Sequence, residues 1–228
     1  MNISTKIIAH RWIDAPWKVS IDNRLSEAIS RGADGIECDV RQTLDGIFII
    51  SHDAKPFGLN KPIEKLAWQE INKTLMANEE NARLDSLLRE ILKTDLLINL
   101  EIKSPKLNLE NLFSQIPEQI KPRLILSSFH PTVIKKVPKN KISQCWLIAF
   151  FFFLPKIIMR FCGASGIAPY YKFLSNHLIK TSQQKNWTVA PWTVNNDSDI
   201  KKVLKSGVNC LITDYPERVK TISKMTID

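Results

Sequence analysis

Short apolar runs alternate with segments of helical spacing along most of this 228-residue chain. Such alternation predicts parallel strands, each followed by a helix that crosses back over the sheet. The strand candidates are 6–11, 35–40, 47–51, 96–104, 123–130, 144–150, 164–171, 187–195 and 210–214. The helix candidates are 24–31, 64–77, 84–94, 109–116, 173–184, 197–205 and the segment from 217 onward.

One connection breaks this pattern. Only a tight turn, Leu44-Asp45-Gly46, separates strand 35–40 from strand 47–51, whereas a parallel crossover needs about a dozen residues. Strand 47–51 is therefore predicted to be antiparallel, and the eight other strands match a (β/α)8 TIM barrel. We expect one domain over residues 1–228, an α/β barrel with a β-hairpin extension after strand 2 and a short helical insertion at 54–95.

Two acids in the second strand form a candidate metal site. Glu37 and Asp39 lie two residues apart, so their carboxylates leave the same face of the strand. Taken alone, the pair also fits the solvated face of an edge strand. Two carboxylates aimed at one place usually have a cation between them, however. His52 ends the hairpin and would bring a proton-transfer group back beside the pair.

Polar residues at the ends of other strands favour the metal site. Active sites of TIM barrels lie at the carboxyl ends of the strands. The polar or aromatic groups at those ends are His10-Arg11, Glu37 and Asp39, Glu101 and Lys103, Ser127–His130, Trp192–Asn195 and Asp214. Carboxylate oxygens suit Mg²⁺, Ca²⁺ or Mn²⁺ better than zinc, and two histidines can supply an acid and a base near neutral pH.

Charge leaves three classes of partner to consider. The net charge is +9, which suits nucleic acid, a membrane surface or a phosphorylated substrate. We see no zinc-finger spacing and no aromatic-basic alternation, so we expect no nucleic-acid partner. The densest run of lysines, 135–141, is expected to be a solvated loop.

The four cysteines and the start of the chain bear on its location. Cys38, Cys145, Cys162 and Cys210 are widely spaced without a CxxC pair, which predicts buried thiols in a reducing compartment. The first residues lead directly into a core strand and leave no room for a signal peptide. We therefore expect the protein in the cytoplasm.

The run WLIAFFFFLPKIIMRF at 146–161 has two interpretations. Its uninterrupted apolar part, Trp146–Leu154, is far shorter than the ~20 residues of a membrane-spanning helix. One interpretation is a buried strand followed by a core-facing loop or helix. In the other, Phe151–Phe161 is a wedge at the barrel mouth that rests on an anionic membrane, which would place the protein at the inner face of that membrane.

Seven motifs, in order, carry a resemblance to a known family. They are IAHR (8–11), GADGIECDV (32–40), TLDGIFIISHD (43–53), LINLEIKS (97–104), LSSFHP (126–131), APWTVNN (190–196) and CLITDYPE (210–217). The chain resembles the glycerophosphodiester phosphodiesterases, of the phosphatidylinositol-phospholipase-like TIM-barrel superfamily. The motifs span almost the whole chain.

The resemblance implies a role for each matching residue. Glu37, Asp39 and Glu101 would bind a divalent cation, Mg²⁺ or Ca²⁺ with Mn²⁺ as an alternative. His10 and His52 would be the catalytic acid and base, in an order that the sequence leaves open. The other implied groups are Arg11 and Lys103 at the phosphate and Trp192 and Phe129 in the substrate pocket. A neighbouring substrate hydroxyl would attack first and give a cyclic phosphate.

Two departures from the family pattern lie near the first strand. Trp12 replaces the glycine of an H-R-G motif, and WKVSIDN (17–23) stands where P-E-N-[ST] is usual. Three functions therefore remain open. They are hydrolysis of glycerophosphodiesters to glycerol 3-phosphate and an alcohol, phospholipase-D-like cleavage of lysophospholipids at a membrane surface, and phosphate binding without catalysis. The matching acids and histidines favour the first.

Four further polar residues lie near the predicted strand ends. Asp53 is expected to orient His52 or brace its turn, and Asp214 to make structural hydrogen bonds near the mouth. His130 is expected to cap a helix or stand behind the site. The role of Asn195 stays open.

Overall fold

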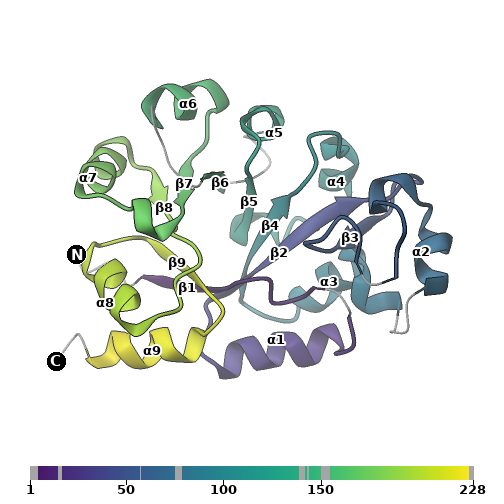
Figure 1. Cartoon of the computed structure of the whole chain (residues 1–228), viewed down its shortest axis with the longest axis horizontal. Coiled ribbons are helices and arrows are strands. Elements are labelled where there is room, and N and C mark those ends of the chain that lie inside the picture. The colour runs from purple at the N-terminus through teal and green to yellow at the C-terminus, as the bar shows by residue number, and fades with distance from the viewer. Residues whose placement is uncertain are drawn as a thin grey trace.

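The computed structural model describes residues 5–225 apart from 15–16, 57, 75–78, 139–141, 143 and 150–154. Within these residues a near-closed barrel of parallel strands is surrounded by helices (Figure 1). The strands are β1 (Lys6–Ala9), β2 (Gly35–Gln42), β3 (Phe48–Ile50), β4 (Leu97–Ile102), β5 (Leu124–Ser128), β6 (Gln144–Ala149), β7 (Gly166–Pro169), β8 (Thr188–Val189) and β9 (Cys210–Thr213).

The strand order confirms the predicted barrel. The order is β8-β7-β6-β5-β4-β2-β1-β9, every neighbouring pair in it is parallel, and β3 alone pairs antiparallel, with β2. Backbone hydrogen bonds join the two ends of this order: Ile212 N donates to Pro191 O at 3.0 Å, and Val194 N donates to Ile212 O at 2.9 Å. The ring therefore closes, with the hairpin as an extension beside it.

Helices follow the strands and cover the outside of the ring (Figure 1). They are α1 (Ile21–Ser30), α2 (Trp68–Thr74), α3 (Leu84–Ile91), α4 (Leu109–Gln115), α5 (Pro131–Lys136), α6 (Pro155–Cys162), α7 (Asn176–Lys185), α8 (Asp197–Lys205) and α9 (Pro216–Met225). Short 3₁₀ turns are η1 (Ile63–Lys65), η2 (Glu79–Ala82), η3 (Lys121–Arg123) and η4 (Tyr171–Phe173).

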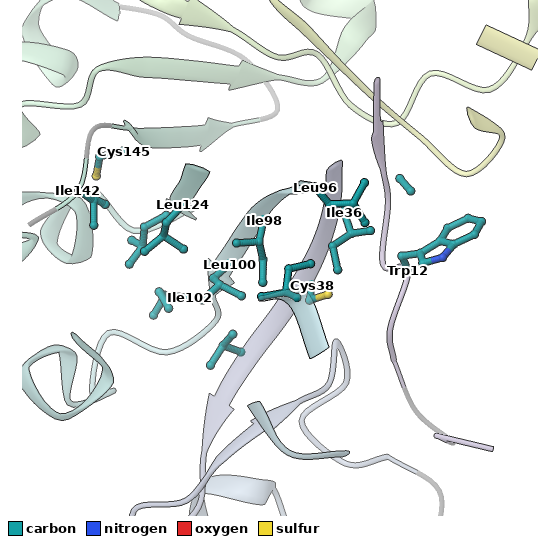
Figure 2. Close-up of a cluster of buried hydrophobic side chains, with 14 of the residues drawn as sticks. Trp12, Ile36, Cys38, Leu96, Ile98, Leu100, Ile102, Leu124, Ile142 and Cys145 are labelled. Atoms are coloured by element: carbon teal, nitrogen blue, oxygen red, sulfur yellow. The ribbon is translucent and has the colours of Figure 1, made fainter. Parts of the chain in front are cut away.

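The two-residue period of the strands divides the core into two parts. Outward side chains such as Ile36, Ile98 and Leu100 pack under the helices (Figure 2), whereas Ile8, Trp146 and other inward side chains fill the barrel. Because side chains alternate, Glu37, Asp39 and Glu101 point inward, at the carboxyl end of the barrel. The apolar packing thus fixes the direction of all three carboxylates.

Trp146 closes the interior of the barrel beside Gly166. A Cβ atom at Gly166 would lie 2.4 Å from Trp146 Cδ1, closer than any real contact. The absence of a side chain at this position therefore lets the fully buried indole lie against β7.

Several predicted boundaries differ from the structure. The segment predicted as a helix at 64–77 contains η1 and then α2, and α1 begins three residues earlier than predicted. The strand predicted at 187–195 is the two-residue β8, because Pro191 lacks the N–H that a longer ladder requires. The lysine run 135–141 was predicted to be a loop, but its first two residues belong to α5, which begins at Pro131.

The segment 151–161 is described only from residue 155 onward, as α6. Met159 is buried and Phe161 is exposed, so α6 is an amphipathic helix with one core-facing side. Contact of this segment with a membrane stays a prediction. No helix in the described ranges is long and apolar enough to cross a membrane. All four cysteines are free and buried, as predicted.

Candidate active site

Strand register brings three carboxylates together at the carboxyl end of the barrel. Asp39 on β2 lies opposite Glu101 on β4, and Glu37 lies opposite Asn99. Glu37, Asp39 and Glu101 each offer an oxygen within 4.8 Å of the other two. Their exposed fractions are only 3%, 2% and 9%, so the predicted acid cluster exists and lies out of water.

Burial and neighbouring negative charge raise the pKa of two of these acids, Glu37 and Glu101. Burial raises the pKa of Glu37 well above its ordinary value, and the charges of Asp39 and Glu101 add to the shift. Burial likewise raises the pKa of Glu101, with Asp39 as the next cause. Glu37 and Glu101 therefore resist ionisation beside Asp39 unless positive charge is supplied.

Lys103 supplies part of that charge. Its Nζ lies 2.7 Å from Glu101 Oε1 and 3.2 Å from Asp39 Oδ1. Burial lowers the pKa of Lys103, but the two carboxylates outweigh burial, and the pKa is above its ordinary value. Arg11 Nε lies 3.7 Å from Asp39 Oδ2. Both predicted phosphate-binding cations therefore border the acid cluster.

The donor atoms of the cluster fit a divalent cation. Glu37 Oε2 accepts a hydrogen bond from Arg11 N at 2.8 Å, whereas Oε1 is buried and has no hydrogen-bond partner among the described residues. An unsatisfied buried carboxylate oxygen is costly, and an all-oxygen donor set suits a hard divalent ion. The three acids can thus bind a metal ion.

His10 is held by a chain of hydrogen bonds from two other strand ends. Its Nδ1 donates to Asp214 Oδ1 at 2.7 Å, and Asp214 Oδ2 accepts from Asn195 Nδ2 at 2.6 Å. The bond from His10 lowers the pKa of Asp214, burial opposes this shift, and Asn195 reinforces it. Asp214 therefore makes the predicted hydrogen bonds, but to a site residue, and Nε2 of His10 remains available to a ligand.

His52, just after β3 of the hairpin, has a matching arrangement. Its Nδ1 donates to Asp53 Oδ1 at 2.8 Å, as predicted for Asp53. Its backbone is fixed as well, because its N–H donates to Asp14 Oδ1 at 3.0 Å and its carbonyl accepts from Arg41 Nη2 at 2.7 Å. Both histidines are thus oriented through Nδ1 by an aspartate.

The histidines and acids open on one cavity of about 150 Å³. Its lining consists of His10, Arg11, Glu37, His52, Asn99, Glu101, Lys103, Phe129, Ile148, Ala168, Trp192 and Ile212. The rings of Phe129 and Trp192 meet edge to face with centroids 5.5 Å apart, and Trp192 Nε1 donates to Ala168 O at 2.8 Å. One side of the cavity is therefore charged and the other apolar.

Every predicted site residue lines this cavity except Asp39, which contacts it through Lys103 and Arg11. His130 is not part of the lining, and its backbone N–H donates to Ser128 Oγ at the start of α5. Sequence reasoning missed Asn99, Asp14 and Arg41. Asn99 could have been found as the inward residue two before Glu101, whereas Asp14 and Arg41 act through the backbone of His52 and leave no local signal.

The two departures near the first strand leave the site residues in place. Trp12 is buried under α1, where its Nε1 donates to Arg24 O at 2.6 Å and the Arg24 and Arg31 guanidinium groups lie over its ring. Trp17 Nε1 donates to Ile50 O at 2.7 Å and so ties the first loop to the hairpin. Both tryptophans therefore brace the site from outside.

Comparison with known proteins identifies the family. Residues 23–218 match the sequence model of the Glycerophosphoryl diester phosphodiesterase family. The chain belongs to this family. A glycerophosphodiester phosphodiesterase of Caldanaerobacter subterraneus subsp. tengcongensis is 30% identical over 240 residues, which are 94% of this chain and 96% of the relative. The predicted family and enzyme class, a phosphodiesterase, are confirmed.

Solved structures of similar fold agree with the barrel. A glycerophosphodiester phosphodiesterase from Parabacteroides distasonis superimposes with a TM-score of 0.83 at 23% identity, over 100% of both chains. An Oleispira antarctica phosphodiesterase, solved in complex with its product sn-glycerol-3-phosphate, has a TM-score of 0.79 at 20% identity, over 96% of both chains. The match to the family model begins at residue 23, after His10 and Arg11. The position of these two residues in the site is therefore known from the structure.

Proposed function

We propose that this chain hydrolyses glycerophosphodiesters to glycerol 3-phosphate and an alcohol, with a divalent cation at Glu37, Asp39 and Glu101. Mg²⁺ and Ca²⁺ suit these ligands best, and Mn²⁺ is the alternative. The chemistry that a bound cation supplies is neutralisation of charge on the phosphoryl oxygens. Two similar proteins support the proposal. The relative from Caldanaerobacter subterraneus is named a glycerophosphodiester phosphodiesterase, and the Oleispira antarctica phosphodiesterase was solved with its product sn-glycerol-3-phosphate.

Arg11 and Lys103 bind the phosphodiester in this proposal. Both cations line the cavity, and both can donate hydrogen bonds to the non-bridging oxygens as negative charge grows in the transition state. Phe129 and Trp192, on the apolar side, would pack against the carbon atoms of the substrate. A charged wall facing an apolar wall thus orients the diester across the pocket.

His10 and His52 carry the protons. One imidazole Nε2 accepts the proton of the attacking hydroxyl, a neighbouring substrate hydroxyl or water, as its oxygen bonds to phosphorus. The other imidazolium donates a proton to the oxygen of the departing alcohol as that P–O bond breaks. If the product is a cyclic phosphate, water opens it with the two roles exchanged. Asp214 and Asp53 would hold each ring in the required tautomer.

One observation carries this proposal: two histidines, each with Nδ1 bound to an aspartate, open on the same cavity as the three acids. The test is release of glycerol 3-phosphate from glycerophosphocholine with Mg²⁺, Ca²⁺ or EDTA. Turnover is expected only with metal and is expected to disappear in His10→Ala and Glu37→Ala. Metal-independent turnover, or full activity of either variant, would contradict the proposal.

A row of aromatic rings favours lysophospholipid cleavage as the second candidate. From the pocket, Trp192 lies 5.7 Å from Tyr170, and Tyr170 lies 6.2 Å from Phe173, between ring centroids. Phe173 is 52% exposed, so apolar surface leads from the cavity to solvent and could accompany an acyl chain. Choline release from lysophosphatidylcholine, without turnover of glycerophosphocholine, would select this candidate.

Phosphate binding without catalysis is the third candidate. Trp12 and the altered first loop motivated it, but both lie outside the cavity and brace it. Binding of glycerophosphocholine in the presence of metal without release of any product would select it. A cytoplasmic location stays a prediction.

A further inference from the structure

The positive charge of this chain is concentrated in one stretch of its sequence. Residues 119–196 contain eleven Lys and Arg and no Asp or Glu. Because the whole chain has a net charge of +9, the remaining residues together carry a slight negative charge. The stretch includes α5, α6 and α7, which follow one another along one side of the barrel (Figure 1). We call the described residues within 119–196 the basic sector.

Most of these cations face solvent without an acidic neighbour. The exposed ones are Lys135, Lys136, Lys156, Arg160, Lys172, Lys180 and Lys185. Within the described part of the chain, none of the seven forms a salt bridge; Lys121, which pairs with Glu118, lies at the edge of the sector. Unpaired cations on one side of a protein create a field that attracts an extended anionic surface.

Exposed apolar side chains lie among these cations. Ile157 and Phe161, four residues apart on α6, are 63% and 51% exposed, and Lys156 and Arg160 precede them. Lys135 Nζ lies 4.3 Å from the centre of the Phe161 ring. Phe173 on η4 is exposed as well. Helix α6 thus buries Met159 on one face and exposes aliphatic, aromatic and basic groups on the other. Such a helix can lie at the boundary between lipid headgroups and acyl chains.

We propose that the basic sector docks on an anionic phospholipid membrane, with Ile157 and Phe161 of α6 entering the headgroup layer. Its cations contact lipid phosphates, and its apolar side chains leave water. A nucleic-acid backbone would neutralise the cations but would offer an exposed isoleucine no apolar partner. A lipid surface accounts for both the exposed cations and the exposed apolar side chains. Phe173 begins the aromatic row to Trp192, so docking also brings the lipid surface near the pocket.

Flotation with phospholipid vesicles tests this surface, using the full chain without substrate. Vesicles of phosphatidylcholine alone are compared with vesicles that also contain phosphatidylglycerol. The apolar variant is Ile157→Ser with Phe161→Ser. The charge variant combines Lys135→Gln, Lys136→Gln, Lys156→Gln and Arg160→Gln. The matched controls are Leu44→Ser and Lys201→Gln with Lys224→Gln, which remove similar exposed groups elsewhere.

The protein is expected to float only with the anionic vesicles. Each cation removed from the sector should lower the partition coefficient about fivefold, the apolar variant should lower it at least tenfold, and the controls should leave it unchanged. Unaltered far-UV circular dichroism and melting would show that the variants fold. Because binding is read without turnover, failure of the proposed catalytic function would leave this test intact.

Two outcomes would overturn the proposal. One is absence of flotation with anionic vesicles at low salt. The other is binding that depends on the four cations but is unaffected by Ile157→Ser with Phe161→Ser. If that second result came with equal affinity for RNA, the sector would be a general polyanion surface, and the membrane would not be its partner.

Discussion

Asp214 Oδ1 lies 2.7 Å from His10 Nδ1, although 204 residues separate them in the chain. The pair forms because β1 and β9 are neighbours, with Ala9 opposite Thr213, so both residues leave adjacent strand ends. Asn195 holds the second oxygen of Asp214 at 2.6 Å. The ring of His10 is therefore fixed by the closing of the barrel itself.

Asp214→Asn is expected to lower kcat about a hundredfold. The amide can no longer stabilise the imidazolium of His10, and it can favour the wrong tautomer. The matched change is Asp53→Asn beside His52. The side chain of Asp53 is 74% exposed, against 44% for Asp214, so water can replace the hydrogen bond that Asp53 makes to His52. The loss of kcat in Asp53→Asn should therefore be no more than about tenfold. The pH dependence of kcat checks both, and equal losses would contradict the asymmetry.

Metal-free protein should lose stability as pH rises. Burial raises the pKa of Glu37 and Glu101 in the fold, so the folded state binds more protons than the unfolded chain. The stabilisation is fully present below the unfolded pKa of about 4.3 and disappears as pH rises through the raised folded values. Calorimetry in EDTA across this range checks the sign.

Glu37→Gln is the companion test of the acid cluster. Removing one ionisable group from three crowded buried acids should raise the Tm of the metal-free protein by about 2–4 °C. It should also remove most of the increase in Tm that Mg²⁺ or Ca²⁺ gives the parent protein. A stabilising effect of metal that persists in this variant would place the metal elsewhere. Glu110→Gln, at an exposed position in the first turn of α4, is the control and should leave both the Tm and the effect of metal on it unchanged.

Lys103→Met should separate phosphate binding from metal binding. The change removes a cation 2.7 Å from Glu101 and 3.2 Å from Asp39, so the acid cluster becomes more negative and should bind a divalent cation at least as tightly as before. Loss of the phosphate contact should lower kcat/KM about a hundredfold. Metal titration by calorimetry and steady-state kinetics measure the two effects. Weaker metal binding in the variant would show that Lys103 orders the cluster.

Gly166→Ala tests the packing inside the barrel. The new Cβ would meet Trp146 Cδ1 at 2.4 Å, and overpacking of this kind costs about 1–3 kcal/mol. Denaturant unfolding measures the loss. In a chain that also carries Trp146→Leu, the cost of Gly166→Ala should shrink, because the clashing ring is gone. An unchanged loss of stability would mean that the backbone of β7, and not the indole of Trp146, prevents a side chain at position 166.

Much of the fold could be predicted because it follows from local pattern. The tight turn at Gly46 required an antiparallel hairpin, and eight remaining strands alternating with helices required a barrel. Glu37, Asp39 and Glu101 could be assigned to one face from their two-residue spacing, since a strand fixes side-chain direction.

The contacts that the sequence left open depend on distant parts of the chain. Asp214 was recognised as a polar strand end, but its bond to His10 depends on which strands are neighbours. Asp14 and Arg41 hold the backbone of His52, and no spacing relates them to it. Pro131 starts α5 after a strand that was predicted to continue to His130, so the helix became visible only in the fold.

Metal-dependent hydrolysis at this site is tested most directly by phosphorus NMR of glycerophosphocholine with the purified protein, in Mg²⁺ or Ca²⁺ and in EDTA. We expect the signal of glycerol 3-phosphate to replace that of the diester only with metal, and His10→Ala and His52→Ala each to stop the conversion. Unchanged diester with metal bound, or conversion by either histidine variant at the parent rate, would contradict it.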